Sequence, residues 1–599
     1  MLNITGITVD HLAEHIVTDN PHPVISFSIE SDRENVLMSR TRISIGGWSL
    51  ETGEQTGIAY RGEDLKPFSA YEVSVRAGDS CGEQAAASVI FHTGRRDLPW
   101  QGSWITDAGY VFRGKKTSPV PMMFRKNFRA GEEPVCAVIC STAMGIYELT
   151  LNGRKVGKDF FAPGFTSYYH QLQYQIYDIT EQLQTNNCLT VTVAGGWAVG
   201  AYTYARYNRL YADRQAFLAE IRIRYRDGRE EVIGTDESWL VTEDGPYRAA
   251  EFYDGEVYDA TIDPEKISWH PAGKTGLKKH PRIKASYGVP VREHEILQPV
   301  SCLKARSGKI IYDFGQNMAG VIRAGVKGRA GQRILFEHAE VLRDGELYTE
   351  PLRTAKQQAV YICRDGFQTY QPHFTYMGFR YVAVSGIEEE DIRLSAVALY
   401  SEVPSIGSFC CSDERLNRLQ KCIEWGAKSN FVDIPTDCPQ RDERLGWTGD
   451  IALFAPTASF QFDMSRFFRK WLREDGSVNL GTQDGGSGMV SFNHYVCGSV
   501  GDFLYRRIAG IEPLEGGYRK FRCAPLTGGG ITSAQGSTRT PYGTLSVRWE
   551  IKDDIFHLEA VVPTGTEGEI VLPDGNVIHT GSGRKRFQCK IPADRQEAG

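Results

Sequence analysis

The sequence predicts a multidomain protein in which several β-sandwich modules are combined with one helical domain. Its 599 residues are too many for a single hydrophobic core, and the length alone suggests about four domains. Up to about residue 400, and again after Pro513, apolar and polar residues alternate between frequent turns, as in β-strands. Between these regions the spacing changes to that of amphipathic helices, so we expect the order β, β, β, α, β.

The first predicted module, residues 1–95, is a small β-sandwich of the immunoglobulin or fibronectin type. Residues 23–29 and 71–76 alternate between apolar and polar side chains and indicate two of its strands. A polar linker at residues 94–98 ends the module.

The second predicted module, residues 96–287, is a β-sandwich with more aromatic residues. An Asn-Gly pair inside Tyr147–Val156 predicts a hairpin with a two-residue turn. Leu189–Trp197 is expected to be a strand that leads into a glycine-rich bend. The run Tyr202–Tyr207 has two interpretations, a carbohydrate groove or packing inside the sandwich, and packing is the commoner use of such aromatic residues.

A third β-sandwich is predicted at residues 288–403, and a C-terminal one at residues 514–599. Two glycine-containing strings of the third module, residues 311–317 and 374–382, indicate closely paired strands.

The helical domain is predicted at residues 404–513. Ser412 is expected to cap its first helix. One face of that helix would carry Leu416, Leu419, Ile423 and Ala427. Further helices are expected at residues 451–460, 464–472 and 492–508.

Composition and charge argue against several classes of protein. The 68 basic and 74 acidic residues give a net charge of −6, without the cationic excess of a dedicated nucleic-acid-binding protein. We see no signal peptide and no apolar run long enough to span a bilayer, so we expect no membrane partner and a cytoplasmic location.

The cysteines and the short motifs give no sign of a metal or cofactor. The 13 cysteines are scattered without a CxxC pair, and we expect them to be small buried hydrophobic residues of a reducing compartment. The sequence contains no phosphate-binding loop, no Rossmann fingerprint and no HExxH motif, so no metal and no cofactor are predicted.

The segment Asp437–Asp450 is the most informative part of the chain. It contains four carboxylates, two arginines and a tryptophan between two helix-like segments. Carboxylates beside cations can hold fixed protonation states, and a tryptophan face can support a sugar ring, so the segment suits acid–base chemistry on a carbohydrate. The alternative is a solvated acidic turn that caps a helix. Cys438 lies in the segment without a histidine nearby in sequence, which argues against a thiol nucleophile.

This segment resembles, almost letter for letter, the signature of bacterial α-L-rhamnosidases of glycoside hydrolase family 78. Residues 312–317, 374–380 and 491–495 resemble further strings of that family. The domain order is also similar: β-sandwich modules that include a lectin-like jelly roll and a concanavalin-like domain, a six-hairpin (α/α)6 catalytic barrel, and a C-terminal β-sandwich. The resemblance implies an inverting enzyme that releases terminal α-L-rhamnose from a glycoside or oligosaccharide.

The resemblance also implies roles for individual residues. Glu443 would be the general acid that protonates the departing glycosidic oxygen. Charged side chains would hold the sugar hydroxyls, and the tryptophan would shape the apolar side of the pocket. The residues implied in sugar binding are Asp437, Arg441, Trp447, Asp450 and His494.

Elementary electrostatics agrees with an acid in this segment. A glycosidase needs one carboxyl that stays protonated near neutral pH beside others that remain ionised. Crowding of Asp442, Glu443 and Asp450 can raise one pKa, while Arg441 and Arg444 keep neighbouring groups charged. The residues alone do not decide which carboxyl is affected, so the role of Glu443 rests on the resemblance.

The chain departs from the family where the general base should be. In relatives the base is a glutamate in a tryptophan-flanked segment shortly before the His494 string. Here Phe467–Val478 joins a helix that follows the acid motif to a loop that follows the base, and the segment between them is missing. Glu474 and Asp475 are the nearest replacement carboxylates, and their simplest interpretation is a solvated turn.

Counting residues supports a truncated barrel. Twelve helices of about 11 residues, with connections of about 4–6, need roughly 200 residues, and the predicted helical domain has about half of that. We therefore predict an α-L-rhamnosidase whose activity is impaired by an internal deletion. The alternatives are an inactive remnant that only binds carbohydrate, and a scaffold protein, which would leave the acid motif unexplained.

Overall fold

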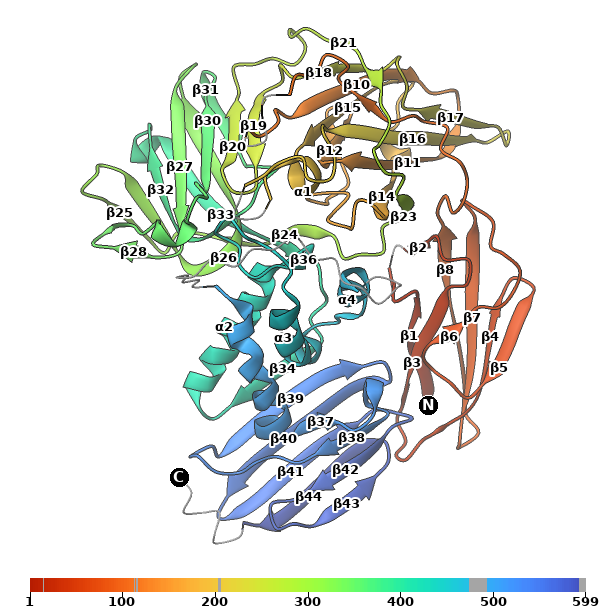
Figure 1. Ribbon diagram of the computed structural model, residues 1–599. Helices are drawn as coiled ribbons and strands as arrows, with labels where there is room; N and C mark the ends of the chain where they lie inside the picture. Colours follow the sequence, from red (N-terminus) through yellow and green to blue (C-terminus); the bar gives the residue numbers. More distant parts are fainter. Residues whose placement is uncertain (15, 113, 115–116, 203–205, 473–492, 592–599) are drawn as a thin grey trace.

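The computed structural model describes residues 1–14, 16–112, 114, 117–202, 206–472 and 493–591. In Figure 1 the chain begins in the sandwich at the right, passes through two further β modules across the top, and returns through central helices to the C-terminal sandwich at the bottom. The predicted fold class, several β-sandwich modules with a helical domain and a C-terminal β-sandwich, is confirmed.

The N-terminal module consists of two sheets that pack around an aliphatic core. One sheet contains β1 (Leu2–Val9), β3 (Val24–Ser31) and β6 (Ile58–Ala59). The other contains β2 (Val17–Thr18), β8 (Gln84–Thr93), β7 (Ala70–Asp79), β4 (Met38–Ile45) and β5 (Trp48–Thr52). In β3 the apolar residues Ile25, Phe27 and Ile29 are buried and the serines between them are partly exposed, as the alternation predicts.

The second module also has two sheets, with its core between them. One sheet contains β13 (Arg154–Val156), β12 (Ile146–Leu151), β15 (Asn186–Ala194), β10 (Met122–Arg129), β18 (Leu240–Thr242) and β21 (His270–Pro271). The other contains β22 (Gly273–Lys274), β9 (Ile105–Thr106), β16 (Ala216–Tyr225), β17 (Glu230–Gly234), β11 (Pro134–Met144), β14 (Gln171–Asp178) and β23 (Arg282–Ala285).

Two local predictions for this module are confirmed. The Asn-Gly hairpin joins β12 and β13, and Asn152 and Gly153 have φ angles of 53° and 77°, the left-handed conformations that such a turn needs. The strand β15 leads through the glycine-rich bend into the short helix α1 (Gly196–Val199). Tyr202 is buried against Phe165, so it packs rather than lining a groove; residues 203–205 lie outside the described part of the chain.

The third module is one large sheet with a shared core. Its strands are β19 (Tyr247–Glu251), β20 (Gly255–Asp259), β30 (Gln358–Ile362), β27 (Arg333–Ala339), β32 (Met377–Ser385), β26 (Ile310–Gly328), β33 (Ile392–Ser401) and β24 (Val291–Leu297), with β25 (Ser301–Lys304) and β31 (Gly366–Tyr370) paired to β26. The predicted range of the second module, 96–287, includes β19 and β20, but β20 pairs with β30, so both strands belong to the third sheet. Alternation identifies a strand without showing which sheet it joins.

Short elements lie between the strands of these modules. They are η1 (Thr180–Gln182), the hairpin of β28 (Leu342–Arg343) and β29 (Glu346–Leu347), η2 (Glu350–Leu352), η3 (Glu389–Asp391) and η6 (Gly516–Tyr518). The turn η2 leads directly into the loop that meets the candidate site.

The helical region is small in the described part of the chain. Its elements are α2 (Glu414–Asn430), the hairpin of β35 (Phe431–Val432) and β36 (Ile434–Pro435), α3 (Thr448–Gln461), α4 (Ser465–Trp471), and the continuous turns η4 (Tyr495–Val500), α5 (Gly501–Phe503) and η5 (Leu504–Ala509). The predicted cap of the first helix is wrong by one residue. Asp413 is the N-cap and accepts a hydrogen bond from Arg415 N, whereas Ser412 Oγ accepts one from Thr532 N.

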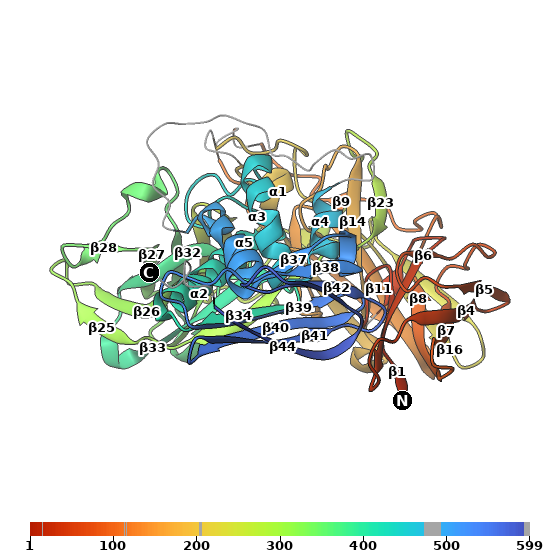
Figure 2. The ribbon, with the colours of Figure 1, turned by 90° about the horizontal axis from the view of Figure 1, so that it is seen from below.

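The C-terminal module closes the molecule with two more sheets. One contains β34 (Gly407–Cys411), β39 (Ser533–Thr540), β40 (Gly543–Lys552), β41 (Ile555–Val562) and β44 (Gly583–Lys590). The other contains β37 (Ile511–Pro513), β38 (Lys520–Cys523), β42 (Glu567–Val571) and β43 (Val577–Thr580). Strands β34 and β37 fall within the range predicted for the helical domain, 404–513, but they complete these sheets. Figure 2 shows the central helices lying against this sandwich.

The cysteines only partly follow the prediction that they are buried. All 13 are free, but only Cys140, Cys363, Cys438 and Cys523 are buried. The exposed cysteines are Cys81, Cys302, Cys410, Cys422 and Cys497. In a strand, the face to which a cysteine points decides how buried it is. Cys410 and Cys411 are neighbours that point to opposite faces of β34.

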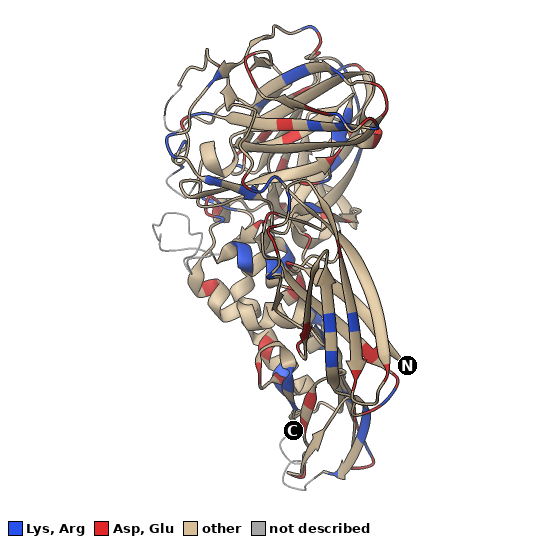
Figure 3. Cartoon of the chain, turned by 90° about the vertical axis from the view of Figure 1, so that its right-hand side faces the viewer, with Lys and Arg blue, Asp and Glu red and all other residues tan. Residues whose placement is uncertain are grey.

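Charge is distributed without separation of the two signs, as Figure 3 shows for the Lys and Arg residues among the Asp and Glu residues. Among the described residues, no helix has the length and apolar character to cross a membrane.

Candidate active site

The segment Asp437–Asp450 forms a buried loop between the β35–β36 hairpin and α3. Residues 437–446 are all buried, while Trp447 is partly exposed and Thr448 is exposed. Trp447 is the N-cap of α3 and makes no side-chain cap hydrogen bond. The alternative interpretation, a solvated acidic turn that caps a helix, is therefore wrong.

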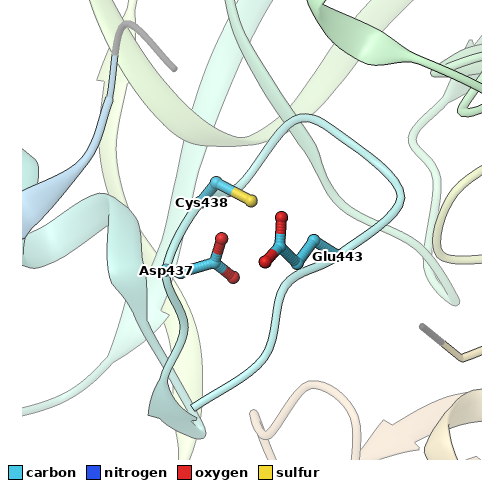
Figure 4. Close-up of side chains that lie close together, drawn as sticks. All are labelled: Asp437, Cys438 and Glu443. Atoms are coloured by element: carbon cyan, nitrogen blue, oxygen red, sulfur yellow. The ribbon is translucent and has the colours of Figure 1, made fainter. Parts of the chain in front are cut away.

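Arg441 joins two acidic side chains of the loop. Its Nη2 donates to Asp437 Oδ2 at 3.1 Å, and its Nε lies 3.0 Å from Glu443 Oε2. The backbone N–H of Leu445 donates to Asp437 Oδ1 at 2.9 Å. Figure 4 shows the carboxylates of Asp437 and Glu443 facing each other, with the Cys438 thiol beside them. The loop therefore folds back so that Asp437 and Glu443, six positions apart, both contact one cation.

Glu443, the candidate acid, has donors at both carboxylate oxygens. Trp447 Nε1 donates to its Oε1 at 3.0 Å, and Arg353 Nη2 donates to its Oε2 at 2.5 Å. The Arg441 guanidinium also contacts Oε2. These contacts fix the orientation of the carboxyl, and the tryptophan predicted to shape the sugar pocket contacts the acid directly.

Asp442 faces a different domain. Its Oδ2 accepts hydrogen bonds from the Thr354 hydroxyl and from the backbone N–H of Thr354, the latter at 3.3 Å. Arg353 Nε lies 3.0 Å from its Oδ1. Arg353 and Thr354 belong to the loop after η2, so the third β module forms one wall of the motif.

Arg444 has a structural role in place of the expected charge-setting one. Its guanidinium donates to three backbone carbonyls, those of Tyr376, Gln440 and Arg441, at 2.7, 3.3 and 3.0 Å. The rings of Tyr253 and Tyr376 flank it, with centroid distances of 5.4 and 4.7 Å. These hydrogen bonds hold the loop's backbone against the β modules, and none of them is made to a carboxylate.

Asp450 and His494 form the more exposed side of the site. His494 Nε2 lies 3.2 Å from Asp450 Oδ1, and their side chains are 25% and 23% exposed. The structure therefore brings together the distant string around His494 and the first turn of α3. A hydroxyl-rich ligand can reach this pair from solvent.

Burial raises the pKa of Asp437 to about 7, and the negative charge of Glu443 adds to this effect. The crowding considered from the sequence did not include this carboxyl. Burial also lowers the pKa of His494, against the opposing attraction of Asp450. The pKa of the Cys438 thiol is raised well above its ordinary value by burial, so this thiol stays protonated and is a poor nucleophile.

One ligand atom each from Asp437, Cys438 and Glu443 lies within 4.8 Å of the others, the kind of grouping that can hold a metal ion. The Arg441 guanidinium already contacts both carboxylates. A metal ion bound there would face this cation directly, so the donor set does not fit a metal.

A general base is not assigned among the described residues. Glu474 and Asp475, the nearest replacement carboxylates by sequence, lie outside the described residues. Asp437 is too close to Glu443 to serve, because an inverting pair needs roughly 6.5–9.5 Å to admit a water molecule.

Sequence reasoning missed the wall of the site that comes from the β modules. Arg353, Thr354 and Tyr253 touch the motif, with the Tyr253 hydroxyl donating to the backbone carbonyl of Glu443 at 2.9 Å. Tyr376 lies in a string that was singled out for strand pairing and for its resemblance to the family, without a role in the site. No spacing pattern marks the other three, since they approach the motif only through the fold.

Five protein families match successive parts of the chain. They are the Rha78A-like N-terminal immunoglobulin domain (4–97), the α-L-rhamnosidase N-terminal domain (132–295), and the bacterial α-L-rhamnosidase concanavalin-like domain (303–401), 6 hairpin glycosidase domain (404–479) and C-terminal domain (510–587).

Two curated relatives agree with these matches. The chain is 37% identical over 393 residues to an α-L-rhamnosidase of Streptomyces avermitilis, covering 63% of this chain and 38% of that protein. It is 32% identical over 460 residues to one of Alteromonas sp., covering 72% and 50%. The chain thus spans half the length of these relatives or less.

The fold agrees as well. The structure of Streptomyces avermitilis α-L-rhamnosidase complexed with L-rhamnose aligns with a TM-score of 0.90 at 20% identity, over 98% of this chain and 100% of that one. Five consecutive domain matches, two relatives above 30% identity and a shared fold point to one family. The chain is therefore composed of the successive domains of bacterial α-L-rhamnosidases.

Proposed function

We propose that this chain recognises terminal α-L-rhamnose in glycosides or oligosaccharides, with Glu443 as the general acid of an inverting hydrolysis. We propose further that its turnover is impaired because the general base is missing. The observation that supports the proposal best is the buried network of Asp437, Arg441, Glu443 and Trp447. It lies in a chain whose successive domains match those of α-L-rhamnosidases.

The acid step follows from the surroundings of Glu443. In its protonated form the carboxyl would donate to the glycosidic oxygen as the bond to the anomeric carbon breaks, so the aglycone leaves as an alcohol. A water molecule would attack the anomeric carbon from the opposite face and lose a proton to a base. The network provides the first of these two proton transfers.

Sugar binding is assigned to the groups around the acid. Asp437, whose pKa is raised to about 7, is present in both protonation states near neutral pH and can donate to or accept from a sugar hydroxyl. Asp450 and His494 can bind hydroxyls at the exposed side, and the partly exposed Trp447 offers an apolar face. A structure of a relative complexed with L-rhamnose supports this choice of sugar.

The impairment is inferred from length and from geometry. The match to the six-hairpin family ends at residue 479, and the C-terminal family begins at residue 510. The region from 404 to 509 is about half of the roughly 200 residues that twelve helices require. The closeness of Asp437 to Glu443 removes the nearest carboxylate as a substitute base.

The second candidate function is carbohydrate binding without turnover. It is favoured by the same observation, because Asp437, Asp450 and His494 can hold a sugar whether or not a base activates water. Free cysteines, five of them exposed, also fit the reducing, cytoplasmic location that we propose.

Release of the aglycone from an aryl α-L-rhamnoside, together with calorimetry of L-rhamnose binding, separates the candidates. We expect binding with little or no release. Rapid release that disappears in Glu443→Gln would overturn the proposed impairment. If neither binding nor release is found, the rhamnose assignment itself is wrong for this chain.

A further inference from the structure

Arg353 has a backbone conformation that is unfavourable for an arginine. Its φ is 57° and its ψ is −109°, a region that glycine adopts readily and residues with a Cβ atom avoid. Such conformations persist when the surrounding contacts impose them, and they occur preferentially at functional sites. The side-chain contacts of Arg353 should therefore show what function an arginine has at this position.

The loop around Arg353 is fixed from two sides. The backbone N–H groups of Lys356 and Gln357 donate to the carbonyl of Tyr253 at 3.1 and 2.9 Å, and Arg206 donates to the carbonyl of Thr354 at 2.9 Å. Thr354 in turn holds Asp442. The main chain is thus anchored independently of the Arg353 side chain.

The Arg353 side chain reaches from this loop to the candidate acid, 90 residues away in sequence. It is 23% exposed, so it stands between solvent and the buried network. Its Nη2 is 2.5 Å from Glu443 Oε2, whereas its Nε is 3.0 Å from Asp442 Oδ1.

A simpler role, as the counter-ion of Asp442, accounts for only part of these contacts. Asp442 already accepts two hydrogen bonds from Thr354, and the shorter contact of Arg353 is to Glu443. Two guanidinium groups contact Glu443 Oε2, whereas from the part of the chain that the structure describes Oε1 receives only the Trp447 hydrogen bond.

We propose that Arg353 is a positioning residue of the rhamnose site: it holds Glu443 Oε2 so that Oε1 is the oxygen presented to the substrate. The inference rests on the proposed function, in which Glu443 is the acid. It assigns a role in positioning the acid to a residue of the third β module, whereas the acid itself comes from the helical region. The planar fork of an arginine is needed, because a lysine cannot span Asp442 and Glu443 in the same way.

The test compares Arg353→Gly, Arg353→Met and Arg353→Lys with a matched control, Arg343→Met. Arg343 lies on the same module, is 66% exposed and is 3.9 Å from Glu350 in its ion pair. The first readout is the Trp447 indole N–H resonance in a nitrogen–proton correlation spectrum, assigned by its absence in Trp447→Phe. This group donates to Glu443 Oε1 and so reports the orientation of the carboxyl. The second readout is the affinity for L-rhamnose, and the third is the melting temperature.

We expect Arg353→Gly to melt at or above the wild-type temperature, because glycine relieves the unfavourable backbone. Its Trp447 resonance should shift and its affinity for L-rhamnose should fall roughly tenfold or more, as for a lost charge-assisted hydrogen bond. Arg353→Met should show the same shift, Arg353→Lys an intermediate one, and Arg343→Met none.

An unmoved Trp447 resonance in the three Arg353 variants would overturn the inference. So would a melting temperature of Arg353→Gly that falls in step with its affinity, because that is the behaviour of a purely structural residue. If instead the proposed function is wrong, the wild-type protein will bind no L-rhamnose. The Trp447 resonance will then still show whether Arg353 positions Glu443.

Discussion

Replacing Asp437 by asparagine tests the main electrostatic feature of the site, the raised pKa of this buried carboxyl. Its pKa rises from 3.8 to about 7 in the folded protein, chiefly through burial. Below pH 3.8 both the folded and the unfolded chain carry the proton, so the contribution to stability is fully present. As the pH rises towards 7 the unfolded chain loses its proton first, and the contribution is lost. At about 1.4 kcal/mol per pH unit, the loss amounts to about 4 kcal/mol.

Asparagine cannot ionise, but it keeps an oxygen for the N–H of Leu445. The stability of Asp437→Asn should therefore depend less on pH between 4 and 7. Between pH 4 and pH 8 the unfolding free energy of the variant should rise by up to about 4 kcal/mol relative to that of the wild type. Urea unfolding at a series of pH values, followed by tryptophan fluorescence, measures this difference. Asp227→Asn, at a side chain 67% exposed, is the matched control. Parallel curves for wild type and Asp437→Asn would refute the reasoning.

Further predictions concern the packing of the site and the origin of the chain. The unfolding free energy of Arg441→Met, measured in urea at pH 7, should be lower by about 3–5 kcal/mol, because buried Asp437 loses its cation and Glu443 loses one of two; Arg441→Lys should recover part of this. Lys470→Met should lose a similar amount of unfolding free energy, because the buried Asp433 carboxylate loses its cation. Adding Asp433→Asn should restore much of that free energy. Strictly additive effects of the two substitutions would contradict the pairing. Gly378→Ala should cost about 1–3 kcal/mol, since the new Cβ would lie 2.7 Å from the Gln440 Cβ; an unchanged melting temperature, equal to that of Gly276→Ala, would contradict this close approach. Sequencing the DNA across the codons for residues 471–476 should reveal no intervening segment if the deletion is genuine, whereas a segment encoding a tryptophan-flanked glutamate would show an assembly error.

Much of the fold was predictable because the side-chain period marks strands and helices directly. The alternation in β3 and the Asn-Gly turn at residues 152–153 depend on neighbours in sequence, and both were predicted correctly. Sheet membership depends on long-range pairing instead. This is why β19 and β20 appeared to belong to the second module, and why β34 appeared to belong to the helical one.

The candidate site was predictable to the same extent. Asp437, Arg441, Glu443 and Trp447 meet because they share one loop, which the sequence marks by its composition. Arg353 comes from another module, and nothing in its sequence surroundings indicates that it reaches Glu443. Arg444 illustrates a second limit, since its charge suggested a partner for carboxylates, whereas burial leaves it bound to backbone carbonyls.

The electrostatics of the site also required the structure. The sequence drew attention to the crowding of Asp442, Glu443 and Asp450; in the structure Thr354 holds Asp442, and Asp450 faces His494. The pKa of Asp437 is raised because this carboxyl is buried and lies next to Glu443. Which group is desolvated depends on how the loop folds back, and residue spacing does not determine that.

We propose that this chain keeps the acid of an α-L-rhamnosidase and lacks the base. The most direct test is aryl α-L-rhamnoside cleavage with and without sodium azide, a nucleophile that needs no general base. Azide would bond to the anomeric carbon as the aryl group leaves with the proton from Glu443, giving rhamnosyl azide and the free phenol. We predict negligible release in buffer, a marked increase with azide, and loss of that increase in Glu443→Gln when the leaving group is poor. Efficient hydrolysis without azide, abolished in Glu443→Gln, would contradict the account by showing that a base is present.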